Sequence, residues 1–189
     1  MGRKKALSKE ELFEATKQLL LERGVHGFHF KELSSMLSVS RSTIYEYYRN
    51  KEQLILAFML SLMEEMNERL ASIDENKPAP DKLFDLMHVF LEYDQIHQIK
   101  EIIHIVQQSR QEVLDHYQTA LVEQHHHMKD KLRSWIDEAK ESGNWRKDIE
   151  TGIIEDLFTH AILFPQKDVI GSEVLARQLF SVIQSGMER

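Results

Sequence analysis

The side chains best equipped for chemistry in this sequence lie in one short polar and aromatic stretch after residue 40. An arginine can fork onto guanine O6 and N7, a threonine can contact a thymine methyl group, and tyrosine hydroxyls suit phosphate oxygens. A lysine a few residues later can favour a phosphate at the start of the following helix. The candidate nucleic-acid contacts are therefore Arg41, Ser42, Thr43, Tyr45, Tyr47 and Lys51.

Two short helical patterns must position these residues, one on each side of a polar break at residues 38–40. Each pattern has an apolar face, formed by Leu33, Met36 and Leu37 in the first and by Ile44 and Tyr48 in the second. This arrangement predicts a helix-turn-helix, in which the second helix enters the major groove while the first crosses the DNA backbone. Ile44 and Tyr48 are predicted to be core residues rather than DNA contacts.

The N-terminal region resembles the TetR family of bacterial transcriptional repressors, over roughly the first third of the chain. The segments that carry the resemblance are Leu-Leu-Leu-Glu-Arg-Gly at 19–24, Gly27-Phe28, Leu33-Ser34, the run at 39–48, and Lys-Glu-Gln-Leu at 51–54. Three positions depart from the family pattern. Ser38 replaces a turn glycine, which predicts a strained turn, and Ser42 replaces a common small glycine in the recognition helix. His29 stands where a Ser or Thr caps the helix, and His is a poor cap.

Length and composition favour a helical protein with an ordinary core. The 189 residues include 42% hydrophobic residues, few glycines and three prolines, which favours helices over a turn-rich β architecture. Cysteine is absent, which excludes disulfides, thiolate nucleophiles and thiolate metal ligands. Because the sequence lacks a signal-peptide run and any stretch of about 18 uninterrupted apolar residues, we expect a cytoplasmic protein with no membrane partner.

The net charge of −7 divides unevenly along the chain. Residues 1–51 hold ten Lys and Arg against six Asp and Glu, whereas residues 52–189 hold 14 against 25. A basic head on an acidic body concentrates the attraction for phosphate where the helix-turn-helix lies. The acidic balance of the body also raises the hypothesis of a cationic lipophilic effector.

The chain is predicted to be all-α, with about nine helices in two domains. Residues 1–51 form a three-helix DNA-binding domain with the helix-turn-helix, and residues 52–189 form a helical domain for effector binding and dimerisation. Ser8 and Glu11 form a capping box at the start of a helix over residues 8–23, and a fourth helix runs over residues 51–73 to a break at 74–80. Apolar residues at helical spacing then predict helices near 83–90, 96–106, 114–139, 153–162 and 175–183.

The last two predicted helices are apolar over more than one narrow face, which is typical of helices that also contact a partner. The resemblance implies a homodimer held by a four-helix bundle of these two helices from each subunit. The predicted interface set is Leu157, Phe158, Ala161, Leu175, Leu179, Val182 and Ile183. The alternative is that all of these residues belong to the chain's own core.

Polar and aromatic residues interrupt the apolar helices of the body, and the resemblance implies an effector pocket there. The predicted effector-binding residues are His88, Tyr93, His97, His104, Tyr117, Gln118, His125, His160 and Phe164. The alternative for each histidine is an ordinary core or surface position. The run His125-His126-His127 does not predict a metal site, since consecutive helical residues point about 100° apart. We therefore expect neither a metal nor a cofactor, and a metal effector is the alternative.

These features predict a TetR-like regulator, most simply a repressor that binds double-stranded operator DNA as a dimer. The operator is expected to be palindromic, and a small hydrophobic effector is expected to release it. One alternative is a ligand-dependent activator or corepressor-type regulator on the same fold. The other alternative is a small helical enzyme. No Gly-rich phosphate loop, H-E-x-x-H pair or nucleophile elbow supports catalysis, so we expect no enzymatic activity.

Overall fold

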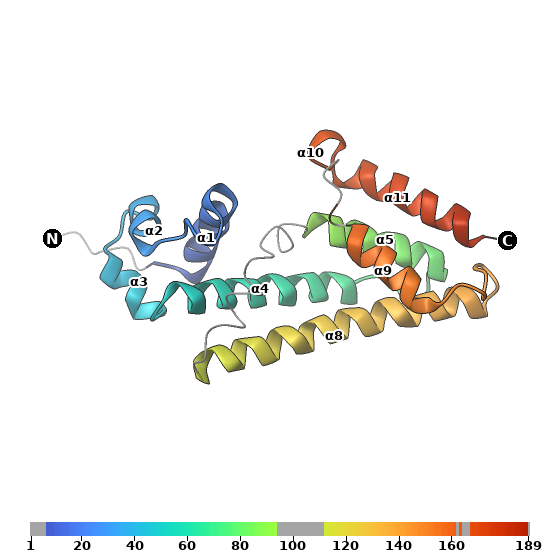
Figure 1. Ribbon diagram of the computed structural model, residues 1–189, viewed down its shortest axis with the longest axis horizontal. Coiled ribbons are helices and arrows are strands. Elements are labelled where there is room, and N and C mark those ends of the chain that lie inside the picture. The colour runs from blue at the N-terminus through green and yellow to red at the C-terminus, as the bar shows by residue number, and fades with distance from the viewer. Residues whose placement is uncertain (1–6, 94–111, 162, 164–166, 189) are drawn as a thin grey trace. The chain divides into compact units, whose positions relative to one another are not determined.

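The computed structural model describes residues 7–93, 112–161, 163 and 167–188, and its regular elements there are all helices (Figure 1). They are α1 (Lys9–Arg23), α2 (Phe30–Met36), α3 (Arg41–Tyr47), α4 (Lys51–Ala71), α5 (Ala79–Glu92), α8 (Glu112–Glu141), α9 (Thr151–Ala161), α10 (Lys167–Ile170) and α11 (Ser172–Met187). The predicted all-α fold with an N-terminal helix-turn-helix is confirmed. The helix predicted near residues 96–106 lies outside the described residues.

Two compact units divide the described chain. The first comprises residues 7–61 with 112–121, and the second comprises residues 62–93 with the described part of 122–188. Helices α4 and α8 therefore contribute residues to both units. The predicted domain boundary after residue 51 stays a prediction.

The first unit is a small helical head whose elements begin and end as local chemistry dictates. At the start of α1 the Glu11 amide donates to Ser8 Oγ at 3.1 Å, and the Ser8 amide donates to Glu11 Oε2 at 3.2 Å. This is the predicted capping box. The α2 helix begins after His29, whose side chain makes no capping hydrogen bond. The fully buried side chains that hold the head together include Leu12, Phe28, Leu33, Ile44 and Leu54.

The second unit is built around aromatic packing between helices that are distant in sequence. The rings of Trp145 and Phe158 lie 6.5 Å apart, those of Phe158 and Phe180 6.3 Å, and those of Phe84 and Phe180 5.5 Å. This chain of contacts joins α5, the turn after α8, α9 and α11, and α11 packs along α5. Large buried aromatic rings contribute much apolar area, so these contacts dominate the cohesion of the unit.

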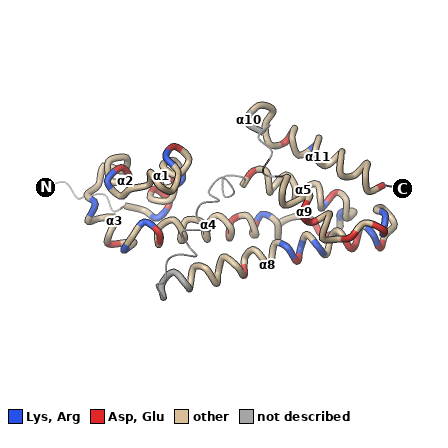
Figure 2. The backbone as a smooth tube through the Cα atoms, in the orientation of Figure 1, with Lys and Arg blue, Asp and Glu red and all other residues tan. Residues whose placement is uncertain are grey.

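The predicted break at residues 74–80 is an ordered turn. The Trp135 indole N–H donates to Glu75 Oε2 at 3.0 Å, and Lys131 Nζ lies 3.0 Å from the other Glu75 oxygen. Lys82, only 2% exposed, pairs with Glu138 at 2.6 Å and lies 5.7 Å from the centroid of the Trp135 ring. Figure 2 shows the acidic and basic residues interleaved along the C-terminal part of α8 that supplies these partners. A buried lysine is tolerated here because a carboxylate and an aromatic face both stabilise its charge.

The turn between α2 and α3 contains the strain that the sequence predicts. Ser38 has a φ of 54°. Among the described residues, it is the single non-glycine residue with a positive φ. The turn is closed by the Val39 amide, which donates to the Ser34 carbonyl at 3.0 Å. A side chain in the left-handed region costs about 1–2 kcal/mol, which a glycine avoids.

We therefore expect Ser38→Gly to raise the free energy of unfolding by roughly 0.5–1 kcal/mol, measured by denaturant titration. Ser35→Gly is the matched control, because Ser35 is exposed within α2 and a helical glycine lowers stability by about 0.5–1 kcal/mol. Equal losses of stability in both variants would contradict the strained turn.

Candidate nucleic-acid interface

A cluster of hydroxyls organises the start of α3. Ser40 caps the helix, since its Oγ accepts the Thr43 amide at 3.2 Å. The same Oγ lies 2.6 Å from Ser42 Oγ and 2.9 Å from Thr43 Oγ1. Both predicted contacts, Ser42 and Thr43, are therefore held in place by the cap. Their hydroxyls lie on the exposed side of the head, where donors and acceptors are available to a nucleic acid.

The two faces of α3 differ sharply in burial. Ile44 is 0% exposed in the core of the head, as predicted. Tyr48 is half-buried beside Phe13, with ring centroids 6.4 Å apart, and this burial raises the pKa of its hydroxyl. Arg41 and Tyr45, three residues before and one residue after Ile44, are exposed.

Tyr45 combines exposure with a fixed position. Its side chain is 54% exposed, yet the edge of its ring packs against Phe30 with centroids 5.0 Å apart. Its hydroxyl has no partner among the described residues. A ring supported on one side with a free hydroxyl at its end is suited to donate to a phosphate oxygen.

Tyr47 and Lys51 make contacts within the head that the sequence did not predict. The Tyr47 hydroxyl donates to the Leu7 carbonyl at 2.6 Å, so its single proton is already used. Lys51 Nζ donates to the Val25 carbonyl at 3.2 Å, in the turn after α1. Each bond joins α3 or the start of α4 to the ends of α1. Contact of these two residues with DNA stays a prediction.

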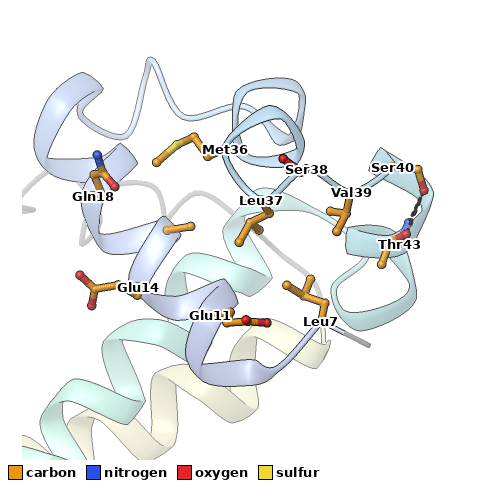
Figure 3. Close-up of a pocket in the computed structure, with 11 residues that line it drawn as sticks. Leu7, Glu11, Glu14, Gln18, Met36, Leu37, Ser38, Val39, Ser40 and Thr43 are labelled. Atoms are coloured by element: carbon orange, nitrogen blue, oxygen red, sulfur yellow. Dashed lines mark hydrogen bonds between the residues drawn. The ribbon is translucent and has the colours of Figure 1, made fainter. Parts of the chain in front are cut away.

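A groove of about 720 Å³ runs between α1 and the turn before α3 (Figure 3). Leu37 and Val39 point into it, and Glu11 and Glu14 belong to its α1 wall. Carboxylates repel phosphates, so this wall disfavours DNA. The surface around Arg41 and Tyr45 is therefore the better DNA-facing side of the head.

The predicted effector residues are distributed over several helices. His88 Nε2 lies 3.8 Å from Glu92 on α5, and exposed His160 on α9 lies with Nδ1 2.7 Å from the Asp156 carbonyl. Partial burial lowers the pKa of His125 on α8, and nearby Lys129 acts in the same direction.

Tyr93 donates to Glu65 at 2.7 Å, and burial followed by this bond raises its pKa to about 12. Tyr117 and Gln118 lie in the part of α8 that belongs to the first unit. His97, His104 and Phe164 lie outside the described residues. The grouping of the effector set around one ligand stays a prediction.

The predicted dimer residues occupy two different faces of α9 and α11. Phe158, Ala161 and Leu175 are buried in the chain's own core, and Leu179 and Ile183 are half-buried. Leu157 and Val182 are 50% and 72% exposed. The structure adds two exposed apolar residues that the sequence analysis missed, Ile153 and Val174, at 56% and 45%. Their spacing of four and eight residues from Leu157 and Val182 is the helical signal that would have found them.

Two further searches of the described part of the chain gave no site. No three His, Cys, Asp or Glu residues there are grouped so that they could hold a metal ion. None of the described helices is long and apolar enough to cross a membrane.

Comparison with known proteins found one family model that matches part of the chain. Residues 12–58 match the model for bacterial regulatory proteins of the tetR family. No curated protein matches the sequence.

Solved structures are similar over nearly the whole chain. The ketosteroid transcriptional regulator KstR2 of Mycobacterium tuberculosis has a TM-score of 0.76 at 13% identity, covering 99% of this chain and 100% of that one. AibR in complex with isovaleryl coenzyme A and operator DNA has a TM-score of 0.70 at 18% identity, covering 92% and 96%. The fatty acid degradation regulator FadR from Bacillus halodurans has a TM-score of 0.65 at 18% identity, covering 96% and 100%. Residues 12–58 therefore resemble the tetR family of bacterial regulatory proteins, and nearly the whole chain shares the fold of these solved structures.

Proposed function

We propose that this chain is a DNA-binding transcriptional regulator, most simply a repressor that binds a palindromic operator as a homodimer. The observation that carries the proposal is the two-faced α3 helix within the segment that matches the family. Its inner face buries Ile44 completely, while Arg41 and Tyr45 remain exposed on a rigid support. A protein of this kind works where its operator is, so we expect it in the cytoplasm, and we infer no enzymatic activity.

The similar structures support a small apolar effector for this chain. AibR was solved with both isovaleryl coenzyme A and operator DNA, KstR2 is named a ketosteroid regulator, and FadR is named a fatty acid degradation regulator. By analogy we infer that an acyl or similarly hydrophobic compound controls the affinity of this chain for DNA. Such a ligand acts only through a difference in its affinity for the two states of the protein.

A ligand that releases the protein from DNA and a ligand that recruits it to DNA change the operator affinity in opposite directions, so one titration distinguishes them. A repressor loses its operator when the effector is added, whereas a corepressor-type regulator gains affinity. Fluorescence anisotropy of a labelled operator fragment during addition of acyl coenzyme A esters, free fatty acids or steroids distinguishes the two.

Arg41 provides the direct test of DNA reading. We expect Arg41→Ala to weaken operator binding by about 1–3 kcal/mol, or roughly 5- to 150-fold, through loss of a forked base contact. Arg23→Ala is the matched control, because it removes the same charge from an exposed position at the end of α1. Anisotropy at fixed salt measures both. Equal weakening of operator binding by the two variants would show that only general charge matters, and it would contradict base contact by Arg41.

The two exposed tyrosines separate DNA contact from internal support. Tyr45→Phe should weaken operator binding by about 1 kcal/mol and leave the free energy of unfolding unchanged, since its hydroxyl has no partner among the described residues. Tyr47→Phe should lower the free energy of unfolding by about 1 kcal/mol, because the bond to the Leu7 carbonyl is lost. Denaturant titration and anisotropy on both variants check this. The reverse pattern would contradict the assignment of the two hydroxyls.

We propose that the exposed apolar faces of α9 and α11 form the dimer interface. Ile153 and Leu157 on α9 and Val174 and Val182 on α11 are all exposed in the single chain. Exposed apolar side chains grouped on helices are typical of surfaces that a partner covers. A palindromic operator requires two recognition helices about 34–36 Å apart. One chain carries a single α3, so we infer that a dimer supplies the pair.

A single charge on this face should separate the subunits. We expect Val182→Asp to raise the dimer dissociation constant by at least about tenfold, because burying an unpaired carboxylate is costly. Val122→Asp is the matched control. Val122 is exposed as well, at 54%, but it lies on α8. Sedimentation velocity over a concentration series measures both variants, with circular dichroism to verify their folding. A Val182→Asp dimer as stable as the control places the interface elsewhere.

A further inference from the structure

A groove of about 490 Å³ lies between α4 and α8 within the second unit. Six of its seven lining residues are polar, and none of them is lysine or arginine. The lining residues are Glu64, Asn67, Glu68, Ala71, Glu123, Gln124 and His127.

The described residues do not balance the negative charge of this groove. Glu64, Glu68 and Glu123 are exposed, and none of them has a cationic partner among the described residues. Elsewhere in the same unit carboxylates are matched by cations: Glu75 pairs with Lys131, Glu138 with Lys82, and Glu155 with Arg133. Three uncompensated carboxylates around one hollow attract a cation from solution.

Asn67 supplies a second and independent indication of a ligand. It is the buried member of the lining, at 8% exposure. Its Nδ2 donates to the Gln124 carbonyl at 3.1 Å and to Gln124 Oε1 at 2.6 Å, which fixes the orientation of the amide. The other amide atom, Oδ1, is buried and has no donor among the described residues. A buried carbonyl oxygen is normally satisfied, so this one requires a donor from outside.

The spacing of the carboxylates distinguishes between classes of cation. A divalent metal needs several oxygens converging at about 2.0–2.6 Å, and the groove residues form no such group. Carboxylates spread around a groove instead match separated positive charges on one flexible chain. Ammonium groups also carry the N–H donors that the Asn67 carbonyl oxygen lacks, whereas a metal ion carries none.

We propose that the groove between α4 and α8 binds an aliphatic polyamine. Its ammonium groups pair with Glu64, Glu68 and Glu123, and one of them donates to Asn67 Oδ1 at the buried end of the site. The methylene groups between the charges lie along Ala71 and the stems of the surrounding side chains. This site goes beyond the proposed function, because it is distinct from any hydrophobic effector and needs no DNA to be detected.

Isothermal titration of the full-length protein with spermidine tests the proposal, at about 0.15 M sodium chloride to screen weak surface attraction. We expect a saturable heat with one spermidine per chain. Butylamine, with a single charge, should bind at least about tenfold more weakly, since each lost charge-assisted contact weakens binding. Magnesium at matched ionic strength should not displace spermidine. Absence of saturable heat, or full displacement by magnesium, would overturn the site.

Paired variants separate the site from the general acidity of the chain. Glu68→Gln with Glu123→Gln should weaken spermidine binding by at least about tenfold. The control pair, Glu141→Gln with Glu150→Gln, removes the same charge from exposed positions outside the groove and should change binding by less than about twofold. Thermal melting verifies that each double variant folds. Equal weakening in both pairs would show nonspecific attraction and would sink the proposal.

Asn67→Leu tests the buried carbonyl separately. The leucine keeps the branched shape of the side chain but removes Oδ1 together with the Nδ2 donor to Gln124, so spermidine binding should weaken by about tenfold while butylamine selectivity persists. If Asn67→Leu melts below the assay temperature, Gln124→Glu replaces it in the same test. That variant adds a carboxylate beside Asn67 and should strengthen spermidine binding, and unchanged binding in it would count against the site.

Discussion

The complete burial of Ile44 is the constraint on which the DNA-reading surface depends. A seven-residue helix has too few backbone hydrogen bonds to hold its own orientation, so its packing must do so. With Ile44 fixed in the core of the head, Arg41 and Tyr45 on the same helix remain exposed to solvent. The Ser40 cap and the ring of Phe30 then limit how far α3 and Tyr45 can move. Recognition of a base edge needs this kind of prior rigidity.

Two residues of the head that were predicted to contact DNA, Tyr47 and Lys51, also make structural contacts within the head. Tyr47 and Lys51 both carry groups that bind phosphates, yet in the structure both donate to backbone carbonyls near the ends of α1. These bonds hold the ends of α1 against the helix-turn-helix and the start of α4. A variant at either position therefore changes the stability of the head together with its affinity for DNA, and the two effects must be measured separately.

The second unit uses charge in two ways. Around Trp135, opposite charges are matched at short distance, and Lys82 and Lys131 lie 5.7 and 5.0 Å from the centroid of the ring. In the groove next to Asn67, the carboxylates have no such partners among the residues that the structure describes. A paired network stabilises the fold at neutral net charge, whereas an unpaired one raises the local concentration of cations. The acidic balance of the body is therefore concentrated in a defined place as well as spread over its surface.

Local features of the fold follow from the sequence because they depend on neighbouring residues. The capping box at Ser8 and Glu11, the Ser40 cap, the strain at Ser38 and the helical periods of α5 and α11 all arise within a few residues. The exposed set on α3 is predictable for the same reason, once Ile44 is identified as core.

Contacts between distant residues were decided only by the tertiary structure. Tyr47 and Leu7 are 40 residues apart, Lys51 and Val25 are 26 apart, and Asn67 and Gln124 are 57 apart, and no local pattern specifies such pairs. The two apolar faces of α9 and α11 look alike in sequence, because both helices are hydrophobic on more than one side. Packing of Phe158 against Trp145 and Phe180 assigns one face to the core, and that choice leaves Leu157 and Val182 at the surface. The sequence by itself determines where helices form and which ends are capped, whereas tertiary packing decides which side chains remain free to bind, since burial depends on partners far along the chain.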